Sequence, residues 1–285
     1  MKTYHETHIR KAEIAQLILL HQLYARQASR DLFFQGGTAL RWCYGGSRFS
    51  EDLDFVTPLE AGAVQRMIQA AVKGAEKLMI PHFGVGEVTL NERRARADAM
   101  KWLVSFQPAR SRGKFSVKLE VERLADKRRP DTQNHVLSLL SPVVYLIAAG
   151  EFLVPRPHTV LVVQTPAEIL SDKIRALLER TYLKGRDLFD LWYLYSVLKT
   201  PVETNTIERK FSLYRAAFVA RRSGRFFISP SPSEREAMRQ AICQDLARFL
   251  PPEVLAVHQA EKFETFLDAA RSLFAALKAG GVRLP

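Results

Sequence analysis

The feature that most constrains the fold is one stretch near the N-terminus, from Leu32 to Val56, which reads LFFQGGTALRWCYGGSRFSEDLDFV. Short apolar runs at its two ends predict strands over 32–34 and 52–56. Between them lie a glycine pair, a helix-like segment over 39–44 and a second glycine pair that can turn the chain. The chain must therefore fold locally into a strand, a short helix and a second strand.

The second of these strands carries two aspartates with one residue between them. Side chains alternate between the faces of a strand, so Asp52 and Asp54 point the same way while Leu53 and Phe55 face a core. Neighbouring carboxylates repel each other unless a cation joins them, and Mg²⁺ takes one or two protein carboxylates together with substrate phosphates. The pattern indicates a metal site, although an edge strand with solvated acids would have the same sequence.

The glycine pair in front of these aspartates indicates phosphate binding. Gly36 and Gly37 allow a backbone to come close to a phosphate, and the start of a helix points free N–H groups towards it. Thr38 adds a hydroxyl directly after the pair. With the glycine pair at this distance before the aspartates, we favour a metal and phosphate site over a solvated strand.

Together, the glycine pair and the D-x-D strand resemble the nucleotidyltransferase signature of the DNA polymerase β superfamily. The form GGTAL…RFSEDLDF is similar to the AbiEii/MenT-type toxins of bacterial toxin–antitoxin systems. The resemblance implies a nucleoside triphosphate (NTP) as substrate, and Mg²⁺ or Mn²⁺ held by Asp52, Asp54 and a third carboxylate. It also implies that the following residues bind the triphosphate: Gly36, Gly37, Thr38, Arg48 and Ser50.

An alternating strand predicted over 114–122, KFSVKLEVE, is the candidate source of the third carboxylate. Lys118, Glu120 and Glu122 share its polar face. In the superfamily a strand beside D-x-D supplies a carboxylate that binds metal and acts as general base on the attacking hydroxyl. Related toxins carry K-x-E here, so the resemblance favours Glu120. Glu122 remains a rival, and a strand with one solvated face is the alternative.

A helix is predicted over 166–182, because Thr165-Pro166-Ala167-Glu168 has the form of a capping box with proline at the first helical position. Lys173 lies on or beside the apolar face of this helix. It must therefore either extend along its stem to water or serve a site. The resemblance favours the site, since similar toxins have a lysine on this helix that meets the triphosphate.

The segment RTYLKGRDLFD that follows fits the R-x-x-x-K-x-R-D-x-x-D pattern of the same toxin family at every fixed position. Gly185 can end one helix, and Asp187 can begin the next. The three cations of this segment could hold phosphates, and its two aspartates, three residues apart, share a helical face and could orient either those cations or the base. The resemblance places Asp187 among the catalytic residues. A helix corner tied by Arg–Asp pairs is the alternative. The residues concerned are Arg180, Lys184, Arg186, Asp187 and Asp190.

The chain has 285 residues and a formal net charge of +12, which favours a polyanionic partner over simple solubility charge. A helix predicted over 207–225 carries six cations interleaved with aromatic residues, a composition suited to gripping RNA or to a solvated basic face. Further basic stretches lie at 91–96, predicted as a turn, and at 123–129. The resemblance adds that relatives of this type modify the 3′ end of tRNA.

The remaining composition indicates a cytoplasmic protein. Cys43 and Cys243 fit no metal-ligand spacing and are expected to be buried thiols in a reducing compartment. No apolar run approaches membrane-spanning length, and the first ten residues are too polar for a signal peptide. We therefore expect no membrane partner.

These patterns predict an α/β (α+β) protein with two domains. Residues 1–164 are expected to form a polymerase β-like nucleotidyltransferase lobe with a small mixed sheet, and residues 165–285 a helical bundle, with the nucleotide in a cleft between them. Helices are expected over 233–249 and 253–279. The resemblance implies a Mg²⁺-dependent toxin that transfers a nucleotide to RNA, blocks translation and is controlled by a cognate antitoxin. The alternatives are transfer to a protein or small molecule, and a module that binds a nucleotide or partner without catalysis.

Overall fold

The computed structural model describes residues 4–95, 98–110, 113–125, 128–282 and 284. These residues form two compact units. The N-terminal unit comprises His5–Gln164, and the C-terminal unit comprises the chain from Thr165 onwards together with Tyr4. All strands of the described residues belong to the first unit, and the second is helical. The mixed α/β class predicted from the sequence is confirmed.

A seven-stranded mixed sheet runs through the N-terminal unit in the order β3-β4-β5-β2-β1-β7-β6. Strand β2 lies at the centre, antiparallel to β1 on one side and parallel to β5 on the other. Strand β7 is parallel to β1, and the remaining neighbours are antiparallel. The strands are β1 Phe33–Gln35, β2 Asp52–Thr57, β3 Gly86–Ala95, β4 Ala99–Pro108, β5 Phe115–Arg123, β6 Thr132–Val136 and β7 Val160–Gln164.

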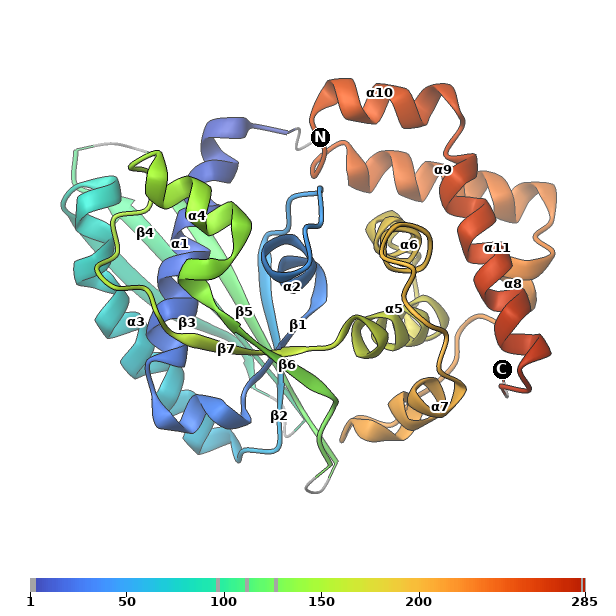
Figure 1. Ribbon diagram of the computed structural model, residues 1–285, viewed down its shortest axis with the longest axis horizontal. Helices are drawn as coiled ribbons and strands as arrows, with labels where there is room; N and C mark the ends of the chain where they lie inside the picture. The colour runs from blue at the N-terminus through green and yellow to red at the C-terminus, as the bar shows by residue number, and fades with distance from the viewer. Residues whose placement is uncertain (1–3, 96–97, 111–112, 126–127, 283, 285) are drawn as a thin grey trace. The chain divides into compact units, whose positions relative to one another are not determined.

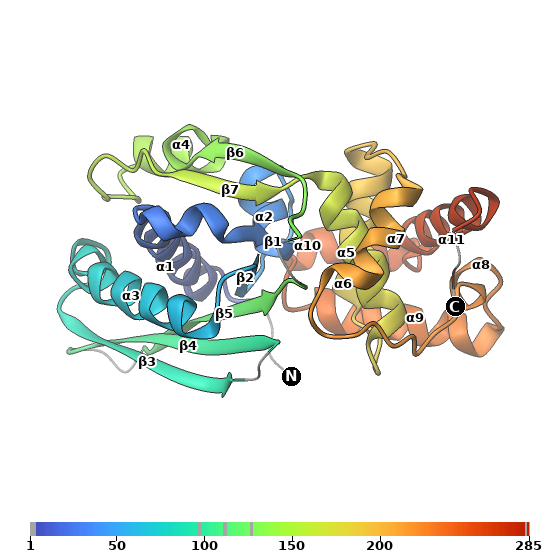
Figure 2. The same cartoon turned by 90° about the horizontal axis from the view of Figure 1, so that it is seen from below.

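Two long helices, α1 (Glu6–Tyr24) and α3 (Ala61–Phe83), lie side by side against this sheet (Figures 1 and 2). The middle of α1 is apolar and fully buried, and its last residue, Tyr24, packs against Phe55 of β2 with ring centroids 6.5 Å apart. The core therefore lies on the face of β2 opposite the two aspartates. The shorter elements are α2 Gly36–Cys43, α4 Ser141–Ala148 and the 3-10 helices Gln27–Asp31 and Leu137–Leu139.

Helix α6 is the central element of the C-terminal unit, where it contacts α5, α9 and α11. Its first residue, Gly185, makes the close packing against α9 possible, because a Cβ there would lie 2.2 Å from the Cα of Ile242. The helices are α5 Pro166–Glu179, α6 Gly185–Trp192 with a π-helical turn at Tyr193–Val197, α7 Thr204–Leu213, α8 Arg225–Ile228, α9 Pro232–Leu246, α10 Pro252–Ala260 and α11 Glu264–Ala279. No helix of the described residues is both long and apolar enough to cross a membrane.

The N-terminal unit differs from the sequence-based prediction at two strands. The basic stretch at 91–96, predicted as a turn, is strand as far as Ala95, and Arg96 lies outside the described residues. Strand β6 was not predicted, because its polar sequence, TQNHV, lacks the apolar alternation of a half-buried strand. It is an edge strand whose first three residues are exposed.

The C-terminal unit differs in its helix boundaries. The helix predicted over 207–225 is wrong: α7 ends at Leu213, and irregular backbone follows to the short helix α8. The helix predicted over 253–279 is divided between α10 and α11, because Lys262 and Phe263 adopt left-handed φ angles of 52° and 59°. Gly185 begins α6 rather than ending the previous helix, which stops at Glu179.

Candidate active site

The two aspartates of β2 and the glutamate of β5 are brought together by strand pairing. The parallel register places Asp54 directly beside Glu120 and Asp52 directly beside Lys118. All four side chains lie on the half-exposed face of the sheet, because the residues between them are buried. Glu122 pairs instead with Val56, one step further from the aspartates. The register therefore favours Glu120 over Glu122 as the third carboxylate.

The glycine pair forms the first turn of α2 and presses against one of these carboxylates. Helix α2 begins at Gly36, three residues earlier than predicted, so the free N–H groups of its first turn belong to the glycine motif itself. Gly36 has φ +79°, and a Cβ there would lie 2.6 Å from Oδ2 of Asp54. Only glycine allows the backbone to lie this close to the carboxylate in that conformation.

Three side chains predicted to bind phosphate lie beneath the glycine pair and are buried. The hydroxyl of Thr38 donates a hydrogen bond to the backbone carbonyl of Asp52. A Cβ at Gly37 would lie 2.2 Å from Nη2 of Arg48 and 3.0 Å from Oγ of Ser50. Only 3% of Arg48 is exposed, and its Nη1 donates to the Phe49 carbonyl at 2.9 Å. These contacts hold the glycine turn in place, and the phosphate roles of the three side chains stay predictions.

Two lysines neutralise the carboxylates on this face. Lys118 Nζ lies 3.1 Å from Oδ2 of Asp52 and 2.5 Å from Oε1 of Glu120. Lys101, from β4, places its Nζ 2.6 Å from the other oxygen, Oε2, of Glu120. Sequence reasoning missed Lys101, whose only available signal was its alternation with buried residues on β4.

These contacts set the charge of Glu120. Burial alone would raise the pKa of its carboxyl group, but hydrogen bonds from Lys101 and Lys118 bring the pKa below its ordinary value. Burial likewise would lower the pKa of the Lys118 ammonium, and Asp52 together with Glu120 raises it above its ordinary value. The glutamate is therefore an anion at neutral pH, as a metal ligand and general base must be.

The residues present fit a divalent metal ion. Asp52 and Glu120 already direct one oxygen each to a single cation, the ammonium of Lys118, and Asp54 lies beside Glu120 in the sheet. Mg²⁺ usually takes one or two protein carboxylates and completes its ligands with water and phosphate. Within the described part of the chain, no three His, Cys, Asp or Glu side chains are already gathered around one metal position. The set is thus an open site of hard oxygen ligands rather than a closed protein cage.

The second group of predicted residues forms a buried ion cluster in the C-terminal unit. Lys173 of α5 places Nζ 3.0 Å from Oδ1 of Asp187 and 2.7 Å from Oδ2 of Asp190, both on α6. Arg180 pairs with the other oxygen of Asp187. The side chain of Lys173 is 10% exposed and those of the aspartates 2–3%, so Lys173 neither extends to water nor stands alone. Lys184 is the N-cap residue of α6, and Arg186 lies in the first turn of this helix, where its charge acts on Asp187.

The cluster keeps Asp187 ionised. Burial alone would raise the pKa of its carboxyl group, but the charges of Arg180, Lys173 and Arg186 hold it well below its ordinary value. A buried carboxylate of this kind is stable only while its cations stay in place. Asp187 therefore holds the two cations that contact it, and its orienting role in catalysis stays a prediction.

A second buried cluster beside the first was not predicted. The ammonium of Lys210, from α7, is fully buried and lies 2.7 Å from carboxylate oxygens of both Glu168 and Asp172 on α5. Arg209 also pairs with Glu168, and the hydroxyl of Tyr214 donates to Asp172. Glu168 thus joins α5 to α7 in addition to its place in the first turn of α5. No local pattern marks this partnership, because the residues lie about 40 positions apart.

Several basic residues that were candidates for nucleic-acid contact form hydrogen bonds or ion pairs within the protein. Arg222 donates to the carbonyls of Leu177 at 2.9 Å, Arg180 at 2.7 Å and Thr181 at 3.2 Å, and so caps the C-terminal end of α5. Lys210 is buried as described. Of the basic residues at 207–225, Arg215, Arg221 and Arg225 are exposed. The candidate RNA surface of this region is therefore smaller than the sequence indicated.

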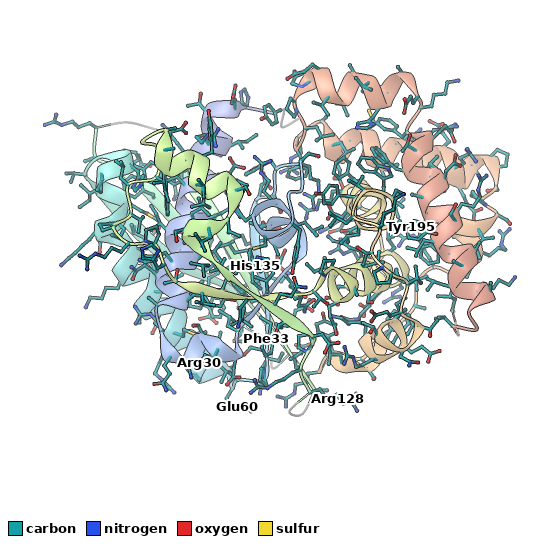
Figure 3. The ribbon with its side chains drawn as sticks, viewed as in Figure 1. Arg30, Phe33, Glu60, Arg128, His135 and Tyr195 are labelled. Atoms are coloured by element: carbon teal, nitrogen blue, oxygen red, sulfur yellow. The ribbon has the colours of Figure 1, made fainter. Side chains whose placement is uncertain are left out.

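Two arginines of the basic stretch at 123–129 also form ion pairs within the protein. Arg123 is buried and pairs with Glu60 at 2.7 Å, and Arg129 pairs with Asp31 at 2.6 Å. Glu60 and Arg128 lie at the same end of the N-terminal unit (Figure 3). Lys127 lies outside the described residues.

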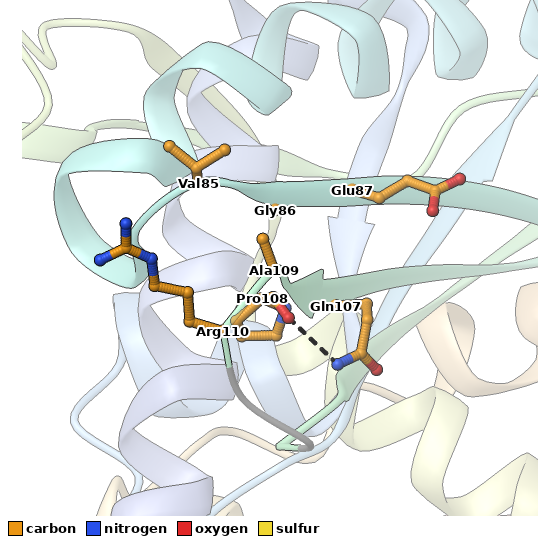
Figure 4. Close-up of a pocket in the computed structure, with 7 residues that line it drawn as sticks. All are labelled: Val85, Gly86, Glu87, Gln107, Pro108, Ala109 and Arg110. Carbon is orange, nitrogen blue, oxygen red and sulfur yellow. Dashed lines mark hydrogen bonds between the residues drawn. The ribbon is translucent and has the colours of Figure 1, made fainter.

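The open pocket shown in Figure 4 lies at the end of the β3–β4 hairpin that is remote from Lys101. Among the residues that the structure describes, Arg110 and Glu87 are the charged side chains that line it, and Gln107 donates to the neighbouring carbonyl of Pro108 at 3.3 Å. It contains neither the glycine pair nor the aspartates. The lining residues are Val85, Gly86, Glu87, Gln107, Pro108, Ala109 and Arg110.

Comparisons with known proteins agree with the chemistry of these residues. Residues 18–269 match the family described as nucleotidyl transferase AbiEii toxin, type IV toxin–antitoxin system. No curated protein matches the sequence.

Two crystal structures from Helicobacter pylori share the fold. A candidate nucleotidyltransferase has 17% identity and a TM-score of 0.57, with 96% of this chain and 98% of that chain covered. The JHP933 protein has 17% identity and a TM-score of 0.54, with coverage of 98% and 97%. At this identity the likeness concerns the fold alone.

The family match spans most of the chain and includes the glycine pair, the aspartate strand and the motif at 180–190. This chain therefore belongs to the AbiEii nucleotidyl transferase toxin family of type IV toxin–antitoxin systems, and it is a nucleotidyltransferase.

Proposed function

We propose that the protein transfers a nucleoside monophosphate from an NTP to an RNA, with the 3′ end of tRNA as the acceptor, and so blocks translation. The observation that carries this proposal is the register of β2 and β5. It sets Asp54 beside Glu120, while Asp52 and Glu120 converge on one cation position next to the first turn of α2. Carboxylates on rigid strands beside a glycine-rich helix start suit a metal-bound triphosphate.

The roles follow from the chemistry of each group. Asp52, Asp54 and Glu120 would hold Mg²⁺ or Mn²⁺, which supplies Lewis-acid polarisation of the phosphate and eases loss of the proton from the attacking hydroxyl. Glu120 accepts that proton. The hydroxyl oxygen forms a bond to the α-phosphorus, the bond from that phosphorus to the bridging oxygen of the β-phosphate breaks, and pyrophosphate leaves. The N–H groups of Gly36 and Gly37 bind phosphate oxygens.

The cations of the second motif would neutralise the triphosphate. Lys173 and Arg180 are held in fixed positions by Asp187, and Lys184 and Arg186 begin the helix that carries it. Fixed cations stabilise charge on transferring phosphates without reorganisation at the moment of reaction. We propose that Lys173 contacts the nucleotide and that Asp187 acts on catalysis through the cations that it orients.

The RNA acceptor is supported by the net charge of +12 and by exposed arginines such as Arg215 and Arg225. A strongly basic protein argues mildly against a cationic small molecule as substrate. Membership in a toxin–antitoxin family implies a cognate antitoxin. We propose the cytoplasm as the compartment, because NTPs and tRNA are found there together.

The test is incubation of the protein with Mg²⁺, total tRNA and each labelled NTP in turn. Wild type should label RNA with a preference among the four nucleotides, and Asp54→Ala should reduce labelling at least about 10³-fold through loss of a metal ligand. Asp268→Ala, a surface aspartate with its side chain 52% exposed, serves as the control and should keep full activity.

The outcome also separates the other functions. Label on protein or on a small molecule instead of RNA would replace the acceptor and keep the reaction. Growth inhibition by Asp54→Ala at the wild-type level, with no transfer to any acceptor, would instead indicate a protein that acts by binding.

A further inference from the structure

One lysine lies where the proposed metal ion is expected. Lys118 is on β5, directly opposite Asp52 in the parallel pairing, and two residues before Glu120. Its ammonium is 3.1 Å from an oxygen of Asp52 and 2.5 Å from an oxygen of Glu120, so it joins the two carboxylates as a shared cation. The remaining oxygen of Glu120 is held by Lys101 at 2.6 Å. Both oxygens of the candidate general base are therefore bound to lysines.

We propose that Lys118 is an internal counter-cation that occupies the position between Asp52 and Glu120 in the nucleotide-free protein, and that a divalent metal ion must displace it to bind. The inference rests on the proposed function of these carboxylates as metal ligands. It adds a residue that controls when the metal can enter.

The exposure of the groups suits exchange rather than permanent pairing. The side chain of Lys118 is 36% exposed, and those of Asp52 and Glu120 are 13% and 19% exposed. A lysine has a flexible four-carbon stem, so its ammonium can withdraw to water while its backbone stays in the sheet. The buried lysines of the C-terminal unit lack this freedom, since the side chain of Lys210 is 0% exposed.

Displacement of Lys118 links metal binding to nucleotide binding. A metal ion that binds alone must compete with an ammonium already present and leave that ammonium without its anions. A metal ion that arrives with a triphosphate brings new anions that can accept the released charge. Metal affinity should therefore be low without nucleotide and should rise when the nucleotide is present.

The experiment measures Mn²⁺ binding by electron paramagnetic resonance, with and without a non-hydrolysable NTP analogue. Without nucleotide, K118M should bind Mn²⁺ at least tenfold more tightly than wild type, because the competing cation is gone. K118R, which retains the positive charge, should remain close to wild type. K114M removes an exposed lysine just before the same strand and should leave the affinity unchanged. The analogue should increase affinity more in wild type than in K118M.

Equal or weaker Mn²⁺ binding by K118M in the absence of nucleotide would overturn the inference. Circular dichroism verifies that the variant is folded. If K118M does not fold, K118Q repeats the titration, and failure of both to fold would show that the ammonium is a structural requirement and would also overturn the inference.

The titration needs no acceptor, so its result is separate from that of the transfer assay. Tighter Mn²⁺ binding by K118M together with no labelling of RNA would refute the proposed acceptor and leave the inference intact. Labelling of RNA together with unchanged Mn²⁺ binding by K118M would support the proposed acceptor and refute the inference about Lys118.

Discussion

Two lysine–carboxylate groups in this protein have the same chemistry and different surroundings. In the N-terminal unit, Lys118 joins Asp52 and Glu120 on a half-exposed sheet face, with the lysine side chain 36% exposed. In the C-terminal unit, Lys173 joins Asp187 and Asp190 with its side chain 10% exposed. The contact distances overlap, at 2.5–3.1 Å in the first group and 2.7–3.0 Å in the second. Distance alone therefore does not distinguish the two groups.

The two groups differ in the free-energy cost of removing one charged partner. At the sheet face water can reach the lysine, while the side chains of Asp52 and Glu120 are 13% and 19% exposed, so an ion pair there should contribute more than a surface pair and less than a fully buried one. In the buried cluster a charge left alone cannot be solvated, so removal of one partner costs about 3–5 kcal/mol. The first group can therefore exchange its cation, whereas the second holds Lys173 in place.

The largest expected effect on stability comes from Asp187→Asn. The substitution leaves Lys173 with Asp190 as its remaining carboxylate partner and leaves Arg180, whose side chain is 37% exposed, facing a neutral amide. It should lower the free energy of unfolding by about 3 kcal/mol. Glu120→Gln, the matched variant at the partly exposed sheet face, should lower it by a smaller amount, about 1–2 kcal/mol. Urea unfolding followed by circular dichroism measures both. Similar losses in the two variants would remove the distinction between exchangeable and fixed pairs.

Gly185→Ala tests whether backbone packing also fixes the second group. A Cβ at this position would lie 2.2 Å from Cα of Ile242 and 2.3 Å from the carbonyl oxygen of Ala241, so α6 must move away from α9. We expect a loss of roughly 2–3 kcal/mol in unfolding free energy. Gly62→Ala in α3 is the control, since the nearest atom would be 3.6 Å away, and it should be neutral or slightly stabilising. A neutral Gly185→Ala would show that α6 is not held in place there.

The buried carboxylate of Asp187 should also make the stability of the protein depend on pH. The pKa of Asp187 in the folded protein is below its unfolded value of about 4, so the unfolded state binds the proton first as pH falls. The stability that this carboxylate contributes is complete above about pH 4 and is lost towards lower pH, at about 1.4 kcal/mol per pH unit. Asp187→Asn should reduce the slope of unfolding free energy against pH by that amount below pH 4. An unchanged slope would mean that the cations of the cluster do not lower the pKa of Asp187 in the folded protein.

The smallest expected effect belongs to the arginine that caps α5. Arg222→Gln removes hydrogen bonds to the carbonyls of Leu177, Arg180 and Thr181, and should cost about 1–2 kcal/mol. Arg221→Gln removes an exposed neighbouring arginine of the same charge and should change stability by less than about 0.5 kcal/mol. Thermal unfolding compares the two. If both variants behave alike, Arg222 does not support the helix that carries Lys173.

The parts of the site that were predictable from the sequence are local. A glycine pair, a turn and an alternating strand each leave a pattern within ten or so residues. Strands β1, β2 and β5 lie within a residue of where those patterns placed them, and α2 begins three residues earlier. Proline after Thr165 likewise marked the start of α5, where the threonine hydroxyl accepts a hydrogen bond from the N–H of Glu168. The family pattern then identified residues that local propensity could not distinguish from surface charges.

The parts that were not predictable depend on contacts between distant segments. Nothing near Lys210 shows that its ammonium will be buried against Glu168, and nothing near Arg222 shows that it will cap α5. Both occur in a stretch whose composition is typical of a basic surface helix. The break between α10 and α11 also has no glycine or proline to mark it, since Lys262 and Phe263 adopt left-handed backbone conformations themselves. In each case tertiary packing overrode local preference.

The contact between Gly36 and Asp54 suggests a way to produce a member of a toxin family in growing cells. A single methyl group at Gly36 would lie 2.6 Å from the Asp54 carboxylate, on a residue whose φ of +79° already disfavours any side chain. Gly36→Ala should displace the carboxylate without removing any charged group. Growing cells could then be made to accumulate this disarmed form, whose surface and electrostatics match the active protein, as material for isolating the antitoxin and for crystallisation.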